Sequence, residues 1–331
     1  MKIATEKEKV AYMVNLQLSR KRQNRTINEK NLKKWRKKQL FLYVLPGILI
    51  CFLFTYLPLW GWSYAFIKYK PGKTLSNSEF VGFHNFTLLF GNPVIRKNVI
   101  QSIKNTLGMN FLSYLVMPVP MIFAIMLNEL KSTRFKKVVQ TISTLPHFIS
   151  WVVMYSLVSG LFSYSGLINA LLMEHGIISA PIEILTTDKH VWIIQTLLGL
   201  WKSLGWSAVI YFSALAGIDQ SMYEAAMLDG AGRFQKIWYI TIPHLVPTFF
   251  VLLIMAMGNM LSTGVDQHFV FGNAMNSEFI TTLDLYVYKL GLGGGNISAG
   301  VAVGILKTVV GVTLFTVANW ISKKVRGNGI A

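Results

Sequence analysis

Histidine, cysteine and acidic side chains are the residues of this chain that could do covalent or metal chemistry. The six histidines include no pair four residues apart and no cysteine partner, which argues against a metal site; they are His84, His147, His175, His190, His244 and His268. The single cysteine, Cys51, lies in an apolar run as a small packing residue and can form no internal disulfide. Asp266 and Glu278 are separate acids with no partner for acid–base work. The sequence therefore indicates no catalytic site and no metal site.

Nucleotide-binding motifs are missing as well. No G-x-x-x-x-G-K-[ST] pattern occurs, and the glycine-rich stretch 291–296 lacks the last glycine of a dinucleotide fingerprint. That stretch is interpreted as a flexible loop. We expect no cofactor to bind by these routes.

The composition indicates an integral membrane protein. Of 331 residues, 53% are hydrophobic and 14% are charged, whereas a soluble protein has about 25% charged residues. The net charge of +18 would suit a nucleic-acid partner, but the charges lie outside long apolar runs, so we expect no nucleic acid and instead a contact with membrane lipid. The apolar content also excludes an intrinsically disordered chain.

Six apolar runs are each long enough to cross a hydrocarbon layer about 30 Å thick. They cover residues 39–67, 105–128, 138–162, 191–215, 245–265 and 299–321. We therefore predict an all-α fold with a six-helix transmembrane domain over 39–322, preceded by a basic segment 1–38 without a cleavable signal peptide and followed by a tail 323–331. In the last run, Gly300 and Gly304 have the spacing that permits close helix packing.

The distribution of basic residues predicts the orientation. Residues 1–38 hold thirteen Lys or Arg and three acids, and the loop 128–137 and the tail are also basic. Loops 164–190 and 266–298 each hold one Lys and three acids. Because basic residues accumulate in cytoplasmic segments, both termini are predicted to be cytoplasmic, with segment 1–38 lying against anionic lipid.

A long motif lies in the predicted cytoplasmic loop 216–244. Residues 223–243 read Tyr-Glu-Ala-Ala-Met-Leu-Asp-Gly-Ala-Gly-Arg-Phe-Gln-Lys-Ile-Trp-Tyr-Ile-Thr-Ile-Pro. This segment resembles the EAA loop of binding-protein-dependent importer permeases, with Ile242 where Leu is usual. Residues 56–61, 140–151 and 297–304 further resemble LplB-type permeases of polysaccharide-utilisation importers, and the resemblance extends over about 40–326.

The resemblance implies a type I ABC importer permease fold in a cell membrane. The family's usual members take up oligosaccharides in Gram-positive bacteria. Such a permease pairs with a second, homologous permease and with two ATPase subunits that bind ATP and Mg. A lipid-anchored solute-binding protein delivers the substrate outside. The resemblance thus implies a transport subunit that is not itself an enzyme.

The physical chemistry of the loop agrees with a coupling role. Ala225 and Ala226 would let a second backbone approach closely, and Glu224 is a candidate to pair with a basic residue of the ATPase. Gly230 allows a turn between two short helices. Pro243, which lacks an N–H, starts or kinks the next helix. The expected coupling residues are Glu224, Ala225, Ala226, Asp229, Gly230 and Pro243.

Five residues are candidates for the substrate cavity, because counting about 1.5 Å per residue from each span end places them near the midplane. They are Trp151, Lys202, Trp206, Asn259 and Lys307. Aromatic faces and hydrogen-bonding groups suit a sugar, and a charge within the hydrocarbon layer usually faces a cavity or a partner. Helix packing, snorkelling or pairing with another subunit are the alternative roles. Lys307 stands where the family usually has a neutral polar residue, which suggests selection of an acidic sugar.

Two other function classes compete with the importer. An ion-coupled secondary transporter would work without an ATPase and would show inverted repeats, of which the sequence offers no convincing example. A membrane-embedded enzyme would need a catalytic cluster, and the sequence contains none. The importer is the hypothesis that the residues favour.

Overall fold

The structure is a computed structural model, and it describes residues 35–70, 72–73, 77–182, 184–186, 188 and 190–326. Most of the predicted segment 1–38 and residues 327–331 of the predicted tail lie outside the described residues. The chain forms two units, residues 1–62 and 63–331. Six helical stretches of the described residues are long and apolar enough to cross a membrane, which confirms the predicted number.

The described part of the first unit, residues 35–62, is one long helical segment. It is helical from Trp35, changes to a π-helical turn at Phe52–Tyr56, and continues as the 3₁₀ helix Leu57–Phe66, whose last residues belong to the second unit. Its large apolar side chains are exposed, for example Tyr43 and Phe54. A helix whose exposed surface is apolar all round is suited to lipid or to another protein.

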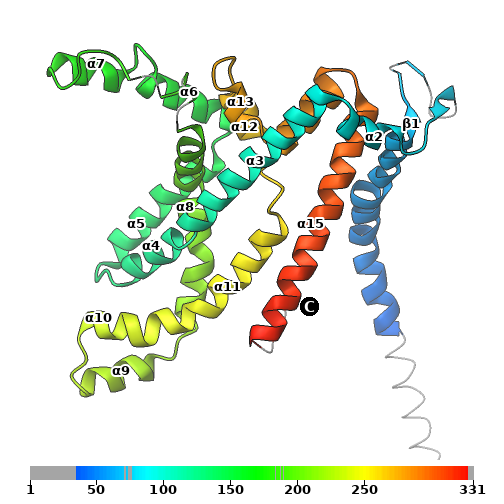
Figure 1. Cartoon of the computed structure of the whole chain (residues 1–331). Coiled ribbons are helices and arrows are strands. Elements are labelled where there is room, and N and C mark those ends of the chain that lie inside the picture. Colours follow the sequence, from blue (N-terminus) through cyan, green and yellow to red (C-terminus); the bar gives the residue numbers. More distant parts are fainter. Residues whose placement is uncertain are drawn as a thin grey trace, which may run out of the picture. The chain divides into compact units, whose positions relative to one another are not determined.

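The second unit is almost entirely helical (Figure 1). A two-stranded antiparallel ribbon pairs β1 (Ile67–Lys68) with β2 (Glu79–Phe80). The longer helices are α2 (His84–Gly91), α3 (Pro93–Val116), α4 (Val119–Asn128), α5 (Thr133–Thr144), α6 (Trp151–Phe162), α7 (Leu167–Glu174), α8 (Val191–Ala216), α9 (Gln220–Leu228), α11 (Ile242–Gly258) and α15 (Ile297–Arg326). The short ones are α10 (Arg233–Lys236), α12 (Asp266–Phe271), α13 (Ser277–Ile280) and α14 (Leu283–Tyr288).

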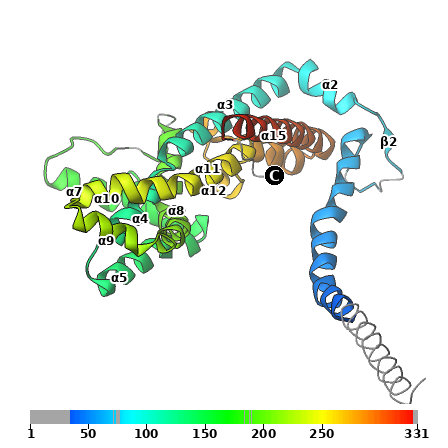
Figure 2. The same ribbon diagram turned by 90° about the horizontal axis from the view of Figure 1, so that it is seen from below.

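Helix α8 organises one half of this unit by packing against α3, α4, α5 and α11 (Figures 1 and 2). Ala124 of α4, Tyr211 of α8 and Leu245 of α11 are buried together in a hydrophobic cluster. At Gly205 the approach of α5 is so close that an added Cβ would lie 2.4 Å from the backbone carbon of Ser143. Only glycine lets these two backbones meet.

Helix α15 organises the other half, where it packs on α2, α11 and α14. Of the two glycines predicted to permit close packing, Gly300 does so, because an added Cβ would lie 2.9 Å from the Cα of Gly291. Gly304 has no atom within 4 Å of an added Cβ. The packing prediction is thus confirmed at Gly300 and not at Gly304.

The predicted span 138–162 is wrong as a single helix. The chain leaves the helix after a 3₁₀ turn at Leu145–Phe148, becomes extended at Ile149, and restarts at Trp151 with Ser150 as the N-cap. Helix α6 is then only 12 residues long, or about 18 Å, so the candidate span continues through a turn to Glu174. The absence of charge, on which the prediction relied, does not reveal a break of this kind.

Two further boundaries differ from the predicted ones. Helix α3 begins at Pro93 rather than near residue 105, because Asn92 caps it by accepting hydrogen bonds from the N–H groups of Val94 and Ile95. Helix α11 ends at Gly258 rather than near residue 265. The following segment forms an irregular turn and then the short helices α12 to α14.

Candidate functional site

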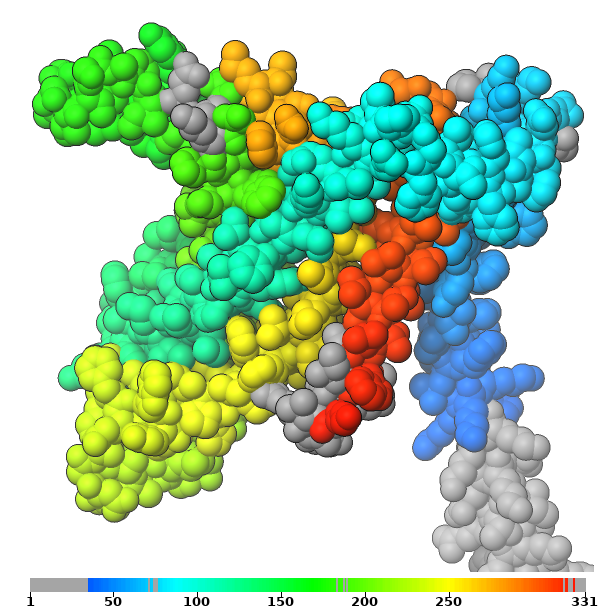
Figure 3. Space-filling model, viewed as in Figure 1, coloured from blue at the N-terminus to red at the C-terminus, as the bar shows by residue number. Residues whose placement is uncertain are grey.

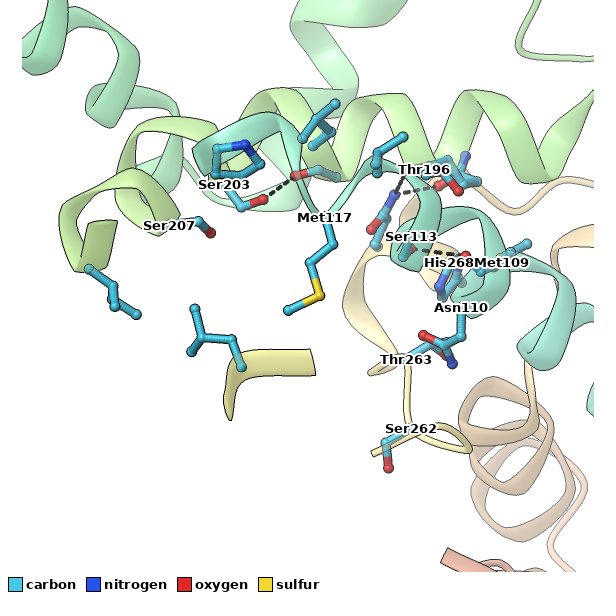
Figure 4. Close-up of a pocket in the computed structure, with 18 of the residues that line it drawn as sticks. Met109, Asn110, Ser113, Met117, Thr196, Ser203, Ser207, Ser262, Thr263 and His268 are labelled. Atoms are coloured by element: carbon cyan, nitrogen blue, oxygen red, sulfur yellow. Dashed lines mark hydrogen bonds between the residues drawn. The ribbon is translucent and has the colours of Figure 1, made fainter. Parts of the chain in front are cut away.

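A polar cavity of about 500 Å³ opens between α3, α8 and α11 and the segment that follows α11. Figure 4 shows side chains from these elements converging on it. Its polar lining residues are Asn110, Ser113, Gln195, Thr196, Ser203, Ser207, Tyr211, Ser262, Thr263, Gln267 and His268. The lining contains no Asp, Glu, Lys or Arg, so the described wall presents hydroxyl, amide and imidazole groups without a formal charge.

The face that α8 presents to this cavity has a simple sequence signature. Gly199, Ser203 and Ser207 follow one another at intervals of four residues, and Gln195 precedes them at the same spacing. Residues four apart lie on one helix face. This stripe was not predicted from the sequence, because small polar residues at helical spacing lack the charges and aromatic rings by which the other cavity candidates were chosen.

Many of the polar groups of the wall are fixed by hydrogen bonds. The Nδ2 of Asn110 donates to the carbonyl of Met260 at 2.8 Å, and the Oγ of Ser203 donates to the carbonyl of Gly199 at 2.8 Å. The Nε2 of Gln267 donates to the carbonyl and side-chain oxygens of Gln195 at 2.8 and 2.9 Å. A wall held in this way can offer its remaining lone pairs to a ligand without reorganising.

Two buried groups in the wall lack a hydrogen-bond partner among the described residues. They are the hydroxyl of Tyr211 and the Nδ1 of His268, whose side chains are 1% and 4% exposed. Burial lowers the pKa of His268 to about 4, against the opposing effect of the nearby Asp284 carboxylate. His268 is therefore neutral at pH 7. An unpartnered buried polar atom is costly in a dry interior, so these two groups mark places where a hydroxyl or a water molecule would be stabilising.

None of the five predicted cavity residues belongs to this lining. Trp151, Lys202 and Trp206 do lie together, at the break that precedes α6. The ammonium group of Lys202 donates to the carbonyls of Pro146 (3.1 Å), His147 (2.9 Å) and Ile149, and lies 5.3 Å from the ring centroid of Trp151. Three carbonyls at a helix end are a good site for a cation, since the negative end of the helix dipole points there.

The other predicted cavity residues make different contacts. The ring of Trp206 stacks on His147 at a centroid distance of 4.6 Å, within the same region. Asn259 is exposed at the end of α11, and its Nδ2 donates to the carbonyl of Met255. Lys307 forms an ion pair with Asp284 of α14. The structure thus gathers three of the five around the helix break and places Asn259 and Lys307 elsewhere.

A second candidate site is the pair of short helices α9 and α10. Asp219 caps α9 by accepting a hydrogen bond from the N–H of Ser221 at 2.9 Å. Gly230 ends the first helix at a φ of +75°, a conformation that glycine adopts without strain. Pro243 lies in the first turn of α11, directly after the π-helical turn Ile237–Thr241, so the helical stretch that begins at Arg233 continues through it.

Two side-chain links fix this helix pair to the rest of the unit. The hydroxyl of Tyr223 shares a hydrogen bond of 2.9 Å with Thr241, in the π-helical turn Ile237–Thr241 that joins α10 to α11. The guanidinium of Arg233 donates to the carboxylate of Glu129 at 2.7 Å and to the Glu129 carbonyl at 2.8 Å. A displacement of this helix pair would therefore be transmitted to both α11 and the end of α4.

The same helices leave large apolar side chains uncovered. Leu228 is 90% exposed and Phe234 is 85% exposed. Trp238 and Tyr239 of the adjoining π-helical turn are also exposed, and Figure 3 shows this part of the surface in yellow and yellow-green. The predicted coupling residue Glu224 is exposed beside them. An apolar patch with a charge at its edge is typical of a protein–protein interface.

Comparison with known proteins agrees with this architecture. Residues 116–327 match the family described as binding-protein-dependent transport system inner membrane component. Protein LplB of Bacillus subtilis is 37% identical over 89% of this chain and 92% of its own length. The polygalacturonan/rhamnogalacturonan transport system permease protein YteP of the same organism is 38% identical over 90% of this chain and 92% of its own length.

Solved structures show the same fold. A chain in the crystal structure of a bacterial ABC transporter involved in the import of the acidic polysaccharide alginate has a TM-score of 0.76 and 33% identity, and the match covers 88% of this chain and 97% of that one. A chain of the alginate transporter in complex with its pentasaccharide-bound periplasmic protein gives a TM-score of 0.78. With the six candidate spans and the matched residues, the chain belongs to the family of binding-protein-dependent transport system inner membrane components, as a multi-pass permease of an ABC transporter with the type I fold and not as an enzyme.

Proposed function

We propose that this permease carries oligosaccharides into the cell by alternating access, with the polar cavity as its part of the path. The observation that carries the proposal is the cavity wall, which offers hydroxyl and amide groups and no formal charge. Proteins recognise sugars by hydrogen bonds to the many hydroxyl groups of the sugar. Uncharged hydroxyl and amide groups in the wall can form such bonds and still release the substrate. Relatives whose names specify polygalacturonan or arabinooligosaccharide transport support this substrate class.

The assembly that we propose contains four kinds of partner. They are a second homologous permease, two ATPase subunits that bind ATP and Mg, an extracellular lipid-anchored solute-binding protein, and the oligosaccharide itself. The alginate transporter solved with its periplasmic binding protein supports the delivery step. External loops 68–97, 164–190 and 266–298 are the regions that we expect to meet the binding protein.

We assign the coupling function to the helix pair α9 and α10. The exposed apolar side chains of Leu228 and Phe234 supply an interface, and Glu224 supplies a charge for a basic residue of the ATPase. Ala225, Ala226 and Asp229 belong to the same helix and its end. Closure of the ATPase dimer would displace this helix pair, and the links from Tyr223 and Arg233 would carry the movement to α11 and α4.

The orientation that we propose places both termini in the cytoplasm of a Gram-positive bacterium. It rests on the basic residues of segment 1–38 and of the loop 128–137. It also puts α9, α10 and Glu129 on the cytoplasmic side, where an ATPase can reach them. An aqueous probe added from one side of the membrane would test this orientation at Leu228→Cys.

The experiment that tests the function compares two single variants of α9 in the assembled importer. Glu224→Ala removes the proposed charged contact, whereas Gln220→Ala alters an exposed residue of the same helix outside the coupling motif. We expect Glu224→Ala to lower both the co-purification of the ATPase and the ATP-driven uptake of an arabino-oligosaccharide or galacturonan oligosaccharide, and Gln220→Ala to leave both near wild type. Equal behaviour of the two variants would contradict the coupling assignment.

A further inference from the structure

The carboxylate of Asp284 in α14 is engaged by groups from two other parts of the chain. Its Oδ2 accepts hydrogen bonds from the backbone N–H groups of Thr263 at 2.9 Å and Gly264 at 3.1 Å. Its Oδ1 pairs with the ammonium group of Lys307 in α15. The side chains of Lys307 and Asp284 are 19% and 15% exposed, so the pair is largely removed from solvent.

The backbone that Asp284 holds belongs to the cavity wall. Residues 259–265 connect α11 to α12 without regular helix, and Gly264 has a φ of +76°. Ser262 and Thr263 of this segment line the cavity. Asn110 of α3 holds the same segment by its bond to the Met260 carbonyl. The wall segment is thus fixed by one side chain from α3 and one from α14.

Lys307 lies on the other side of this wall. It lines an almost wholly apolar groove of about 520 Å³ between α2, α3 and α15, and it is not part of the polar cavity. Its positive charge balances the Asp284 carboxylate, whose burial without a counter-charge would be strongly unfavourable. The arrangement gives Lys307 a partner within its own chain, in place of a substrate carboxylate.

We propose that Asp284 and Lys307 are positioning residues, whose ion pair fixes segment 259–265 so that Ser262 and Thr263 form a rigid part of the cavity wall. Lys307 acts through Asp284 and does not read the charge of the substrate. The inference rests on the proposed function, in that the cavity is taken as the path of the sugar. It follows that the transport of neutral and of acidic oligosaccharides depends on the ion pair to the same degree.

The test measures how firmly the wall segment is held in the assembled importer. Thr263→Cys in a Cys51→Ser background is labelled with a water-soluble maleimide, alone and combined with Asp284→Ala, Lys307→Met, or the double change Asp284→Asn with Lys307→Met. In the double variant, Asn at position 284 keeps an oxygen that accepts from the Thr263 N–H. Met at position 307 removes the ammonium charge, which would lack a partner once position 284 is neutral. Asp266→Ala, which removes an exposed carboxylate at the start of α12, is the matched control.

We expect Asp284→Ala to speed the labelling about tenfold or more, since hydrogen bonds to a charged group are lost, and Lys307→Met to speed it less. The neutral double variant and Asp266→Ala should label at close to the reference rate. Unchanged labelling in Asp284→Ala, or a double variant as fast as Asp284→Ala, would overturn the proposal.

The uptake arm separates positioning from charge recognition. The KM for an arabino-oligosaccharide and for a galacturonic-acid oligosaccharide is measured in the wild type, Lys307→Met and the double variant. We expect Lys307→Met to raise the KM of each transported sugar by a similar factor and the double variant to restore it. A KM that rises only for the acidic sugar, and stays high in the double variant, would make Lys307 a substrate contact. Absence of ATP-driven uptake in the wild type would refute the proposed function, while the labelling result would still decide the role of the pair.

Discussion

Substitutions at the single position Gly230 should destabilise the turn between α9 and α10 to different degrees. Gly230 has a φ of +75°, no atom within 4 Å of an added Cβ, and an N–H that donates to the Met227 carbonyl at 3.1 Å. Gly230→Ala therefore meets no steric obstacle and pays only for the left-handed backbone, about 1–2 kcal/mol. Gly230→Asn should be milder, because Asn visits this region more readily. Gly230→Pro should be the most damaging, since its φ is fixed near −65° and its N–H is lost.

A second glycine of the same turn supplies the control. Gly232 has a φ of −69° and its added Cβ would meet only the Gln235 side chain at 3.6 Å, so Gly232→Ala should be tolerated. An energy of 1–2 kcal/mol corresponds to a factor of about 5–30 in the population of the native turn. The assay is the amount of ATPase that co-purifies with the permease, together with ATP-driven uptake. Equally mild effects of Gly230→Ala and Gly232→Ala, or full uptake by Gly230→Pro, would contradict a coupling role for the left-handed turn at Gly230.

Three further predictions concern stability, measured as thermal unfolding of the purified permease. Gly300→Ala should destabilise the protein by about 1–3 kcal/mol through its contact with Gly291, whereas Gly304→Ala should be neutral or stabilising; equal effects would contradict the packing. The free energy of unfolding should fall by up to about 3 kcal/mol as pH drops from 6.5 to 4, because His268 has a native pKa of about 4 and takes up a proton only on unfolding. His268→Gln should remove this part of the pH dependence. A pH profile that is the same in His268→Gln and in the wild type would contradict the prediction. Lys202→Met should cost about 1–3 kcal/mol, because three carbonyls lose their donor; a fully stable variant would show that water replaces the ammonium group.

The fold class followed from composition and from the spacing of apolar runs. Long uncharged segments can satisfy their backbone in lipid only as helices, so six runs predicted six spans. The described residues contain six helical stretches that are long and apolar enough to cross a membrane. The short helices α12 to α14 were not predicted, because four to six residues carry too little periodicity to be recognised. The helix break at Ile149 was not predicted for a different reason. The Ile149 carbonyl accepts a hydrogen bond from Lys202, which is 53 residues away in the sequence.

In the candidate site, too, features that depend on local sequence could be predicted, and features that depend on distant contacts could not. The turn at Gly230 could be predicted from local chemistry, because a left-handed backbone conformation depends on the residue itself. Pro243 was predicted to start or kink the next helix, and it lies where the π-helical turn Ile237–Thr241 passes into α11. The partner of Lys307 could not be assigned, because Asp284 meets it only after α14 and α15 have packed together. A charge within an apolar run predicted a partner or a cavity, and the choice between them required the fold.

The energy source of uptake distinguishes an ABC importer from a secondary transporter. Membrane vesicles containing this permease, its partner permease, the ATPase and the binding protein would be loaded with ATP and Mg, or given an ion gradient without ATP. We expect oligosaccharide uptake with internal ATP and none with the gradient alone, together with loss of ATP-driven uptake in Gly230→Pro. Uptake driven by the gradient, or ATP-driven uptake that survives Gly230→Pro, would contradict this expectation and favour an ion-coupled secondary transporter.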